Sequence, residues 1–136
     1  MIIKVSPDKE KVKSMLALIE NRLKFAGSIS IDDFPTMAAE NYYEVIKELS
    51  ASLLLLDGLK ATGEGAHKEL ILNLKIYKEI SSYEVDLIDD LRDKRNKSSY
   101  EGRSVGKEYV ASRKGQWLEI IGILKKMIDS KLRGVK

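Results

Sequence analysis

Apolar residues recur every three or four positions along most of this 136-residue chain, the spacing that places them on one face of an α-helix. Five stretches show this pattern, and turns rich in glycine or polar residues separate them. No stretch alternates apolar and polar residues convincingly, so no β-strand is predicted. The expected helices begin at Pro7, near Pro35, near Ala66, after Ser81 and near Lys107.

Local signals at two of these starts have a clear physical basis. Pro7 is predicted to be the first residue of a helix, because proline is tolerated at the first helical position. Ser6, directly before it, is then placed at the N-cap, where serine is favoured. Asp8 then lies in the first turn, where a negative charge favours the helix dipole. Ser81 and Glu84 have the spacing of a capping box, which predicts the start of the fourth helix.

The same pattern gives the expected extents and the fold class. The third helix is predicted over roughly residues 66–80, a polar loop over 98–106, and the fifth helix over about 107–131. Short connections favour antiparallel neighbours. We therefore predict an all-α, up-and-down antiparallel bundle of four to five helices, forming one domain over residues 1–136.

The run Leu53–Leu56 is apolar all round the helix axis, so it belongs either to the core or to an interface with another chain. The run is too short to cross a bilayer, and we expect no contact with a membrane. The chain has no cysteine, and its first ten residues have no apolar signal segment. We expect a cytoplasmic protein.

Positive charge is concentrated in one part of the sequence. The net charge is only +3, but residues 92–114 hold eight Lys or Arg against three Asp or Glu. Such a patch attracts phosphate groups, and the alternative is a solvated helix surface without a ligand. Acids early and bases late in the fourth helix also suit its dipole, whatever the function.

Motifs for metal or cofactor chemistry are nearly absent. Glu64 and His67 match the Glu-x-x-His pattern of metal sites in helical bundles, but no second copy follows. The neighbouring apolar stripe places His67 on the apolar side of the third helix, which favours a partly buried, hydrogen-bonded histidine. We expect no metal and no cofactor.

The stretch Arg92–Gly102, "RDKRNKSSYEG", carries the remaining chemistry. Arg95 can bind a phosphate with two hydrogen bonds, Asn96 can bind a phosphate oxygen or cap the helix end, and Tyr100 can stack on a base. The alternative is structural: Tyr100 folds back on the bundle. In that case, the two arginines pair with nearby acids, Arg92 and Arg95 with Asp89, Asp90 and Glu101.

At these residues, and in "GLKATGEGAHKELI" from Gly58 to Ile71, the chain resembles the HEPN domains (higher eukaryotes and prokaryotes nucleotide-binding), especially small archaeal ones. The resemblance covers most of the chain. It implies a helical bundle that commonly dimerises and places two motifs beside one cleft. Many members are metal-independent ribonucleases, and others bind RNA or nucleotides, often beside a small nucleotidyltransferase.

The family motif is an Arg, often followed by Asn, and a His that is separated from the Arg by four to six residues. Arg95 and Asn96 match it, but Tyr100 stands where the shortest form has His. Tyrosine, with a pKa near 10, is a poor base at neutral pH. His67 could supply a base only if the fold, or a second protomer, brought it to Arg95.

We therefore expect a homodimeric HEPN-like protein that binds RNA or nucleotide, with ribonuclease activity reduced or absent. One alternative is a metal-independent, toxin-like endoribonuclease, with Arg95 and Tyr100 as candidate catalytic residues. Another is a non-catalytic partner of a nucleotidyltransferase, anchored by the apolar second helix. The predicted binding residues are Arg92, Arg95, Asn96, Lys97, Tyr100 and Arg103, with His67 as a possible accessory.

Overall fold

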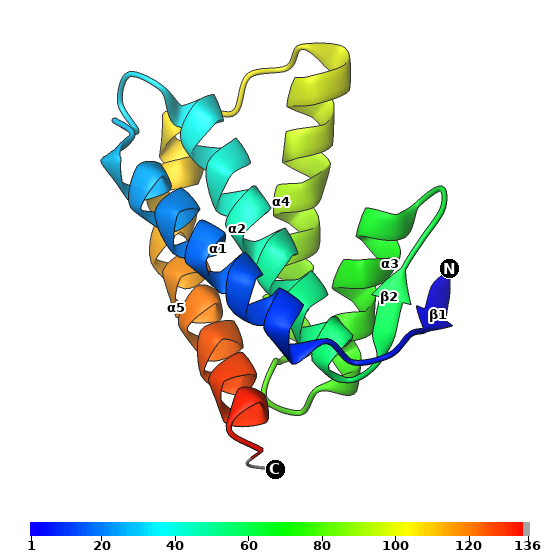
Figure 1. Cartoon of the computed structure of the whole chain (residues 1–136). Helices are drawn as coiled ribbons and strands as arrows, with labels where there is room; N and C mark the ends of the chain where they lie inside the picture. Colours follow the sequence, from blue (N-terminus) through cyan, green and yellow to red (C-terminus); the bar gives the residue numbers. More distant parts are fainter. Residues whose placement is uncertain (135–136) are drawn as a thin grey trace.

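The computed structural model describes residues 1–134, and over these residues the chain forms five α-helices and one two-stranded sheet (Figure 1). The predicted all-α bundle is confirmed. The helices are α1 (Lys9–Ser28), α2 (Pro35–Leu56), α3 (Ala66–Asn73), α4 (Ser82–Glu101) and α5 (Lys107–Leu132). The strands are β1 (Ile2–Lys4) and β2 (Leu59–Ala61), and a 3-10 turn, η1 (Leu74–Ile76), follows α3.

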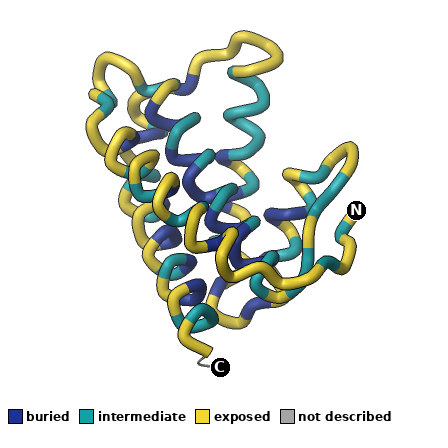
Figure 2. The backbone as a smooth tube through the Cα atoms, in the orientation of Figure 1, coloured by how far each residue is buried: buried dark blue, intermediate teal, exposed yellow. Residues whose placement is uncertain are grey.

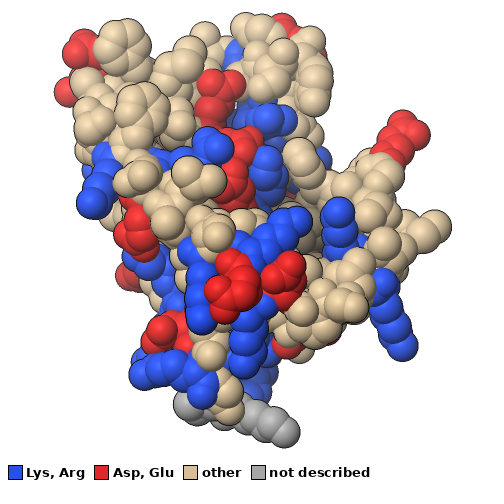
Figure 3. Space-filling view, in the orientation of Figure 1, with Lys and Arg blue, Asp and Glu red and all other residues tan. Residues whose placement is uncertain are grey.

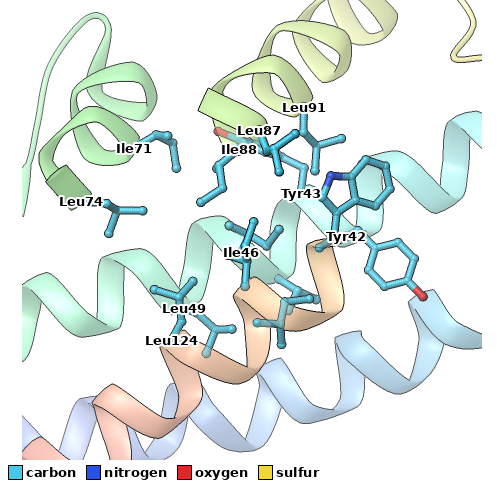
Figure 4. Packing of buried hydrophobic residues seen from close by; sticks show 14 of the residues in the cluster. Tyr42, Tyr43, Ile46, Leu49, Ile71, Leu74, Leu87, Ile88, Leu91 and Leu124 are labelled. Atoms are coloured by element: carbon cyan, nitrogen blue, oxygen red, sulfur yellow. The ribbon is translucent and has the colours of Figure 1, made fainter. Parts of the chain in front are cut away.

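Helix α2 lies between the other elements and contacts α1, α3, α4, α5 and β2. Its buried side chains include Tyr42, Tyr43, Ile46 and Leu49, which meet residues of α3, α4 and α5 in one core (Figure 4). The residues of α2 other than Met37 are accordingly buried or half-buried, whereas the outer faces of its neighbours carry many exposed residues (Figure 2). This helix therefore holds α3 and α4 in place.

The apolar run at the end of α2 belongs largely to this core. Leu53 and Leu54 are fully buried within the chain. Leu55 and Leu56 are half-buried and pack against the same cluster. The packing of one chain therefore accounts for the burial of most of this run.

Helix α1 starts two residues later than predicted. Its N-cap is Asp8, whose carboxylate accepts a hydrogen bond from the backbone N–H of Lys11 at 2.9 Å. The prediction that Ser6 caps the helix was wrong because the preceding residues continue the sheet. The backbone N–H of Val5 donates to the carbonyl of Gly58 at 2.8 Å, which keeps the chain extended at this point.

The antiparallel pair of β1 and β2 was not predicted. Each strand has three residues, too few for a period of two to be recognised. Ile2 lies opposite Ala61 and Lys4 opposite Leu59. The half-buried side chains Ile2 and Leu59 pack against the core, so the sheet attaches the start of the chain beside α3.

Helix α3 ends at Asn73, so the prediction of a helix to residue 80 was wrong. The backbone becomes extended at Tyr77, whose hydroxyl donates to the Asp57 carboxylate at 2.5 Å. Tyr77 and Ile80 are buried, and burial in a loop produced the apolar pattern that resembled a helix.

Helix α4 begins with the predicted capping box, which is confirmed. The Ser81 hydroxyl accepts from the Glu84 N–H at 3.1 Å, and the Glu84 carboxylate accepts from the Ser81 N–H at 2.9 Å. The helix then continues to Glu101, so the predicted loop over 98–106 is wrong in its first half. The Ser98 hydroxyl bonds to Glu40 of α2 at 2.8 Å, and Gly102 ends the helix at a φ of 67°.

Among the helices within residues 1–134, none is both long enough and apolar enough to cross a membrane.

Candidate phosphate-binding cleft

A cleft of about 270 Å³ lies between the start of α3 and one face of α4. It combines the turn between β2 and α3 with side chains from α4, more than twenty positions further along the sequence. Asn96 and Tyr100 come from the predicted motif, and His67 was predicted to lie on the apolar side of α3. The lining residues are Gly63, Gly65, Ala66, His67, Lys68, Arg92, Asn96 and Tyr100.

The α4 side of the cleft depends on helical periodicity. Arg92, Asn96 and Tyr100 follow one another at intervals of four residues, which places them on the same face of a helix. The three side chains share a face only because α4 continues past Ser98, so that Tyr100 is also helical. Tyr100 is 79% exposed and does not fold back on the bundle, so that part of the structural alternative is wrong.

Arg92 is the best-placed cation of the cleft. Its Nε donates to the Asp89 carboxylate at 2.8 Å, and this pair holds the guanidinium in place. The terminal amino groups of the same guanidinium have no hydrogen-bond acceptor within residues 1–134. A guanidinium fixed on one side and open on the other is suited to bidentate binding of a phosphate.

The α3 side adds backbone and side-chain donors. Gly63 and Gly65 have φ values of 81° and 74°, and they turn the chain directly into α3. The first residues of the helix, Ala66, His67 and Lys68, line the cleft, so the positive end of the helix dipole lies at this wall, although the Ala66 N–H is already bonded to the Gly63 carbonyl at 3.2 Å. Lys68, in the first turn, adds a mobile positive charge.

His67 lies in this cleft and is exposed, which corrects the prediction of a partly buried, hydrogen-bonded histidine on the apolar side of α3. It makes no hydrogen bond to another residue of the described chain. Partial removal of its imidazole from solvent lowers its pKa, and the charges of Lys47 and Arg95 lower the pKa further. The imidazole is therefore neutral at pH 7 and can accept a proton.

Arg95 faces α2 rather than the cleft. Its guanidinium pairs with the Glu44 carboxylate at 3.4 Å and lies 5.8 Å from the centre of the Tyr43 ring. It also donates to the Asn96 side chain at 3.5 Å, at the edge of the cleft. Arg95 does not line the cleft. It lines a separate polar hollow together with Glu40, Asn41, Glu44 and Ser99. The structural alternative was right that Arg95 pairs with an acid, but the acid comes from α2.

The other two predicted cations lie outside the cleft. Lys97 pairs with Asp93 at 3.0 Å, one helical turn back along α4. Arg103 pairs with Glu101 at 3.4 Å, beyond the end of α4. On the face that Figure 3 shows, Lys and Arg side chains lie beside Asp and Glu side chains over much of the surface.

Three residues near the cleft were not predicted. Lys68 follows His67 directly, and the resemblance over Gly58–Ile71 was the signal that could have identified it. Lys47 and Glu44 pair with each other at 2.8 Å on α2. Lys47 lowers the pKa of His67 and Glu44 raises it. An ion pair three residues apart on a helix is common, however, and does not indicate a site.

The Glu-x-x-His pattern does not form a metal site. Within residues 1–134, no group of three or more His, Cys, Asp or Glu side chains is arranged to hold a metal ion. The side-chain donors of the cleft are the guanidinium of Arg92, the ammonium of Lys68 and the amide of Asn96. This set is complementary to the oxygen atoms of a phosphate.

Comparisons with family models, with curated proteins and with solved structures give no match for this chain. The functional interpretation therefore depends on the geometry of the cleft.

Proposed function

We propose that the protein is HEPN-like and binds RNA or a nucleotide by its phosphate in the cleft between α3 and α4, with ribonuclease activity reduced or absent. The observation that carries this proposal is the meeting of Arg92, Asn96 and Tyr100 with His67 and Lys68 across one cleft. The first two and Lys68 supply donors for phosphate oxygens. Tyr100, being exposed beside them, supplies a ring on which a base stacks.

The proposal shifts the binding role from Arg95 to Arg92. The guanidinium of Arg95 is engaged by Glu44 and lies over the Tyr43 ring, so it orients Asn96 and contributes positive potential. Arg92 keeps its terminal amino groups directed away from its single acidic partner. Homodimerisation and association with a nucleotidyltransferase are expectations of the family resemblance, and no observation within the described chain adds to them.

Fluorescence anisotropy with a labelled single-stranded RNA and with a labelled nucleotide tests the proposal. We expect saturable binding that weakens steeply with salt, since contacts to phosphate release counterions. Arg92→Ala should weaken binding about tenfold or more, because a charge-assisted hydrogen bond contributes about 1.5–3 kcal/mol. Arg103→Ala is the matched control, as Arg103 is exposed, is paired with an acid and lies outside the cleft. Equal losses in the two variants, or no salt-sensitive binding by the unaltered protein, would contradict the proposal.

Endoribonuclease activity is the second candidate, and the position of His67 favours it. A neutral imidazole in the same cleft as Arg92 and Asn96 could take the proton from a ribose 2′-hydroxyl, the task for which Tyr100 is poorly suited. Cleavage of labelled RNA with a chelator present tests this candidate. His67→Gln should abolish cleavage and leave RNA binding intact, and cleavage that persists in this variant excludes His67 as the base.

A further inference from the structure

An apolar hollow, which shares no residue with the cleft, lies between α1, α2, β2 and α3. Its volume is about 150 Å³. Met15 of α1, Leu54 of α2, Leu59 of β2 and Leu70 of α3 each contribute a wall. The second strand and the start of α1 thus border one apolar space.

The lining is apolar except for two cations. It consists of nine residues, and all but Lys11 and Lys60 are aliphatic or methionine. Leu54 is fully buried and Leu70 is 5% exposed, so the inner walls belong to the hydrophobic core. A space of about 150 Å³ is large enough to hold a benzene-sized apolar group.

The two lysines come from different elements, Lys11 from α1 and Lys60 from β2. Both are exposed, and a lysine beside an apolar space keeps its ammonium group in water while its carbon chain covers the apolar surface. Neither forms an ion pair within residues 1–134, although many other charged side chains do. The opening therefore carries two positive charges that no acid of the described chain neutralises.

One wall can also adjust its shape. Met15 is half-buried, and its sulfur atom has a single weak polar contact, accepting from the Ser52 hydroxyl at 3.8 Å. Methionine side chains change conformation at low cost and fill irregular spaces. The hollow can therefore accept apolar groups of somewhat different shape without disturbing Leu54 or Leu70.

We propose that this hollow binds a small amphiphilic carboxylate, with an apolar group of about the size of a benzene ring between Leu54 and Leu70 and the carboxylate between Lys11 and Lys60. The apolar walls select the body of the ligand, and the two ammonium groups select its charge. A cationic ligand of the same shape is disfavoured, because it would place a third positive charge at the opening.

Methyl NMR spectra of the whole protein, recorded during titration with phenylacetate, test the proposal. We expect saturable shifts of the methyl groups of Met15, Leu54 and Leu70. Phenethylamine, a cation of similar shape, should bind at least tenfold more weakly. The double variant Lys11→Gln/Lys60→Gln should weaken phenylacetate binding about tenfold and leave the binding of neutral benzyl alcohol unchanged.

A cavity-filling variant provides an independent readout. Ala51→Leu adds a side chain to the wall of the hollow, and circular dichroism checks that the variant is folded. It should remove the phenylacetate shifts. Two results would overturn the proposal: no saturable methyl shifts with phenylacetate, or equal affinities for phenylacetate and phenethylamine. Neither result bears on RNA or nucleotide binding, because no residue is shared with the cleft.

Discussion

At the scale of single residues, neighbours decide what a side chain can do. Arg92 and Arg95 are three positions apart, yet one has free donors in the cleft and the other is engaged by Glu44 and the Tyr43 ring. Sequence spacing predicted both as binding residues. It could not separate them, because the acid that engages Arg95 comes from another helix.

His67 gives a measurable consequence of these neighbours. It is the one histidine of the chain, so its imidazole gives a single set of NMR signals. We expect a titration midpoint below the usual 6.5, because partial removal of the imidazole from solvent and nearby cations disfavour the imidazolium form. Lys47→Ala should raise the pKa of His67. Lys125→Ala, which alters a lysine paired with Glu20 elsewhere, should leave this pKa unchanged.

The direction of the pH effects follows from the same shift. The folded state binds the proton of His67 less readily than the unfolded state, so this group makes folding less favourable as pH falls below about 6.5. A phosphate in the cleft stabilises the imidazolium, so it should raise the pKa of His67 and bind more tightly as pH falls. A midpoint at or above 6.5 in the free protein, or one that phosphate ligands do not move, would contradict this account.

At the scale of elements, the sequence predicted best where long periodic stretches carry their own end signals. The start of α2 at Pro35 and the capping box of α4 were correct, and α5 ended within one residue of its expected position. The errors lie where tertiary contacts override local pattern. Pairing with the residues around β2 keeps the chain extended through Val5, and buried loop residues resembled a continuation of α3.

The β1–β2 pair depends on one glycine. Gly58 has a φ of 72°, and a Cβ atom at this position would lie 2.9 Å from the carbonyl oxygen of Val5. Gly58→Ala should therefore cost the strain of a left-handed alanine, about 1–2 kcal/mol, and about 1–3 kcal/mol more from the clash. Urea unfolding measures the total, and hydrogen exchange at the Val5 amide measures the local loss.

Gly63→Ala is the control for this prediction. Gly63 also has a positive φ, 81°, but an added Cβ atom would meet nothing within 4 Å. This variant should lose only the backbone contribution of about 1–2 kcal/mol. If the two variants lose the same free energy of unfolding, the close approach of Gly58 to Val5 has no energetic effect.

At the scale of the whole molecule, α2 determines how the other helices are placed. It contacts α3 and α4 on one side and α1 and α5 elsewhere, so the distance across the cleft depends on the packing of its side chains. This is why the fold class and part of the site could be predicted from the sequence, whereas their geometry could not. Asn96 and Tyr100 could be proposed from their spacing, whereas the approach of His67 to them required the packed bundle.

Leu53 tests the importance of this packing. It is fully buried in α2, and Leu53→Ala should lower the free energy of unfolding by about 2–5 kcal/mol, because the truncation leaves a cavity. Leu18→Ala is the matched control: Leu18 is also helical but is 60% exposed, and we expect a change within about 0.5 kcal/mol. Urea unfolding followed by circular dichroism compares them. Similar losses in the two variants would contradict a central structural role for α2.

The aromatic centre of the core has a practical consequence for spectroscopy. Trp117 is the single tryptophan of the chain, is fully buried, and lies 5.8 Å from the Tyr42 ring and 6.0 Å from the Tyr109 ring. Its fluorescence should be blue-shifted in the folded state and should move to longer wavelength when water reaches the indole. Trp117 lines neither the cleft nor the apolar hollow, so its emission can report the opening of the bundle independently of either ligand.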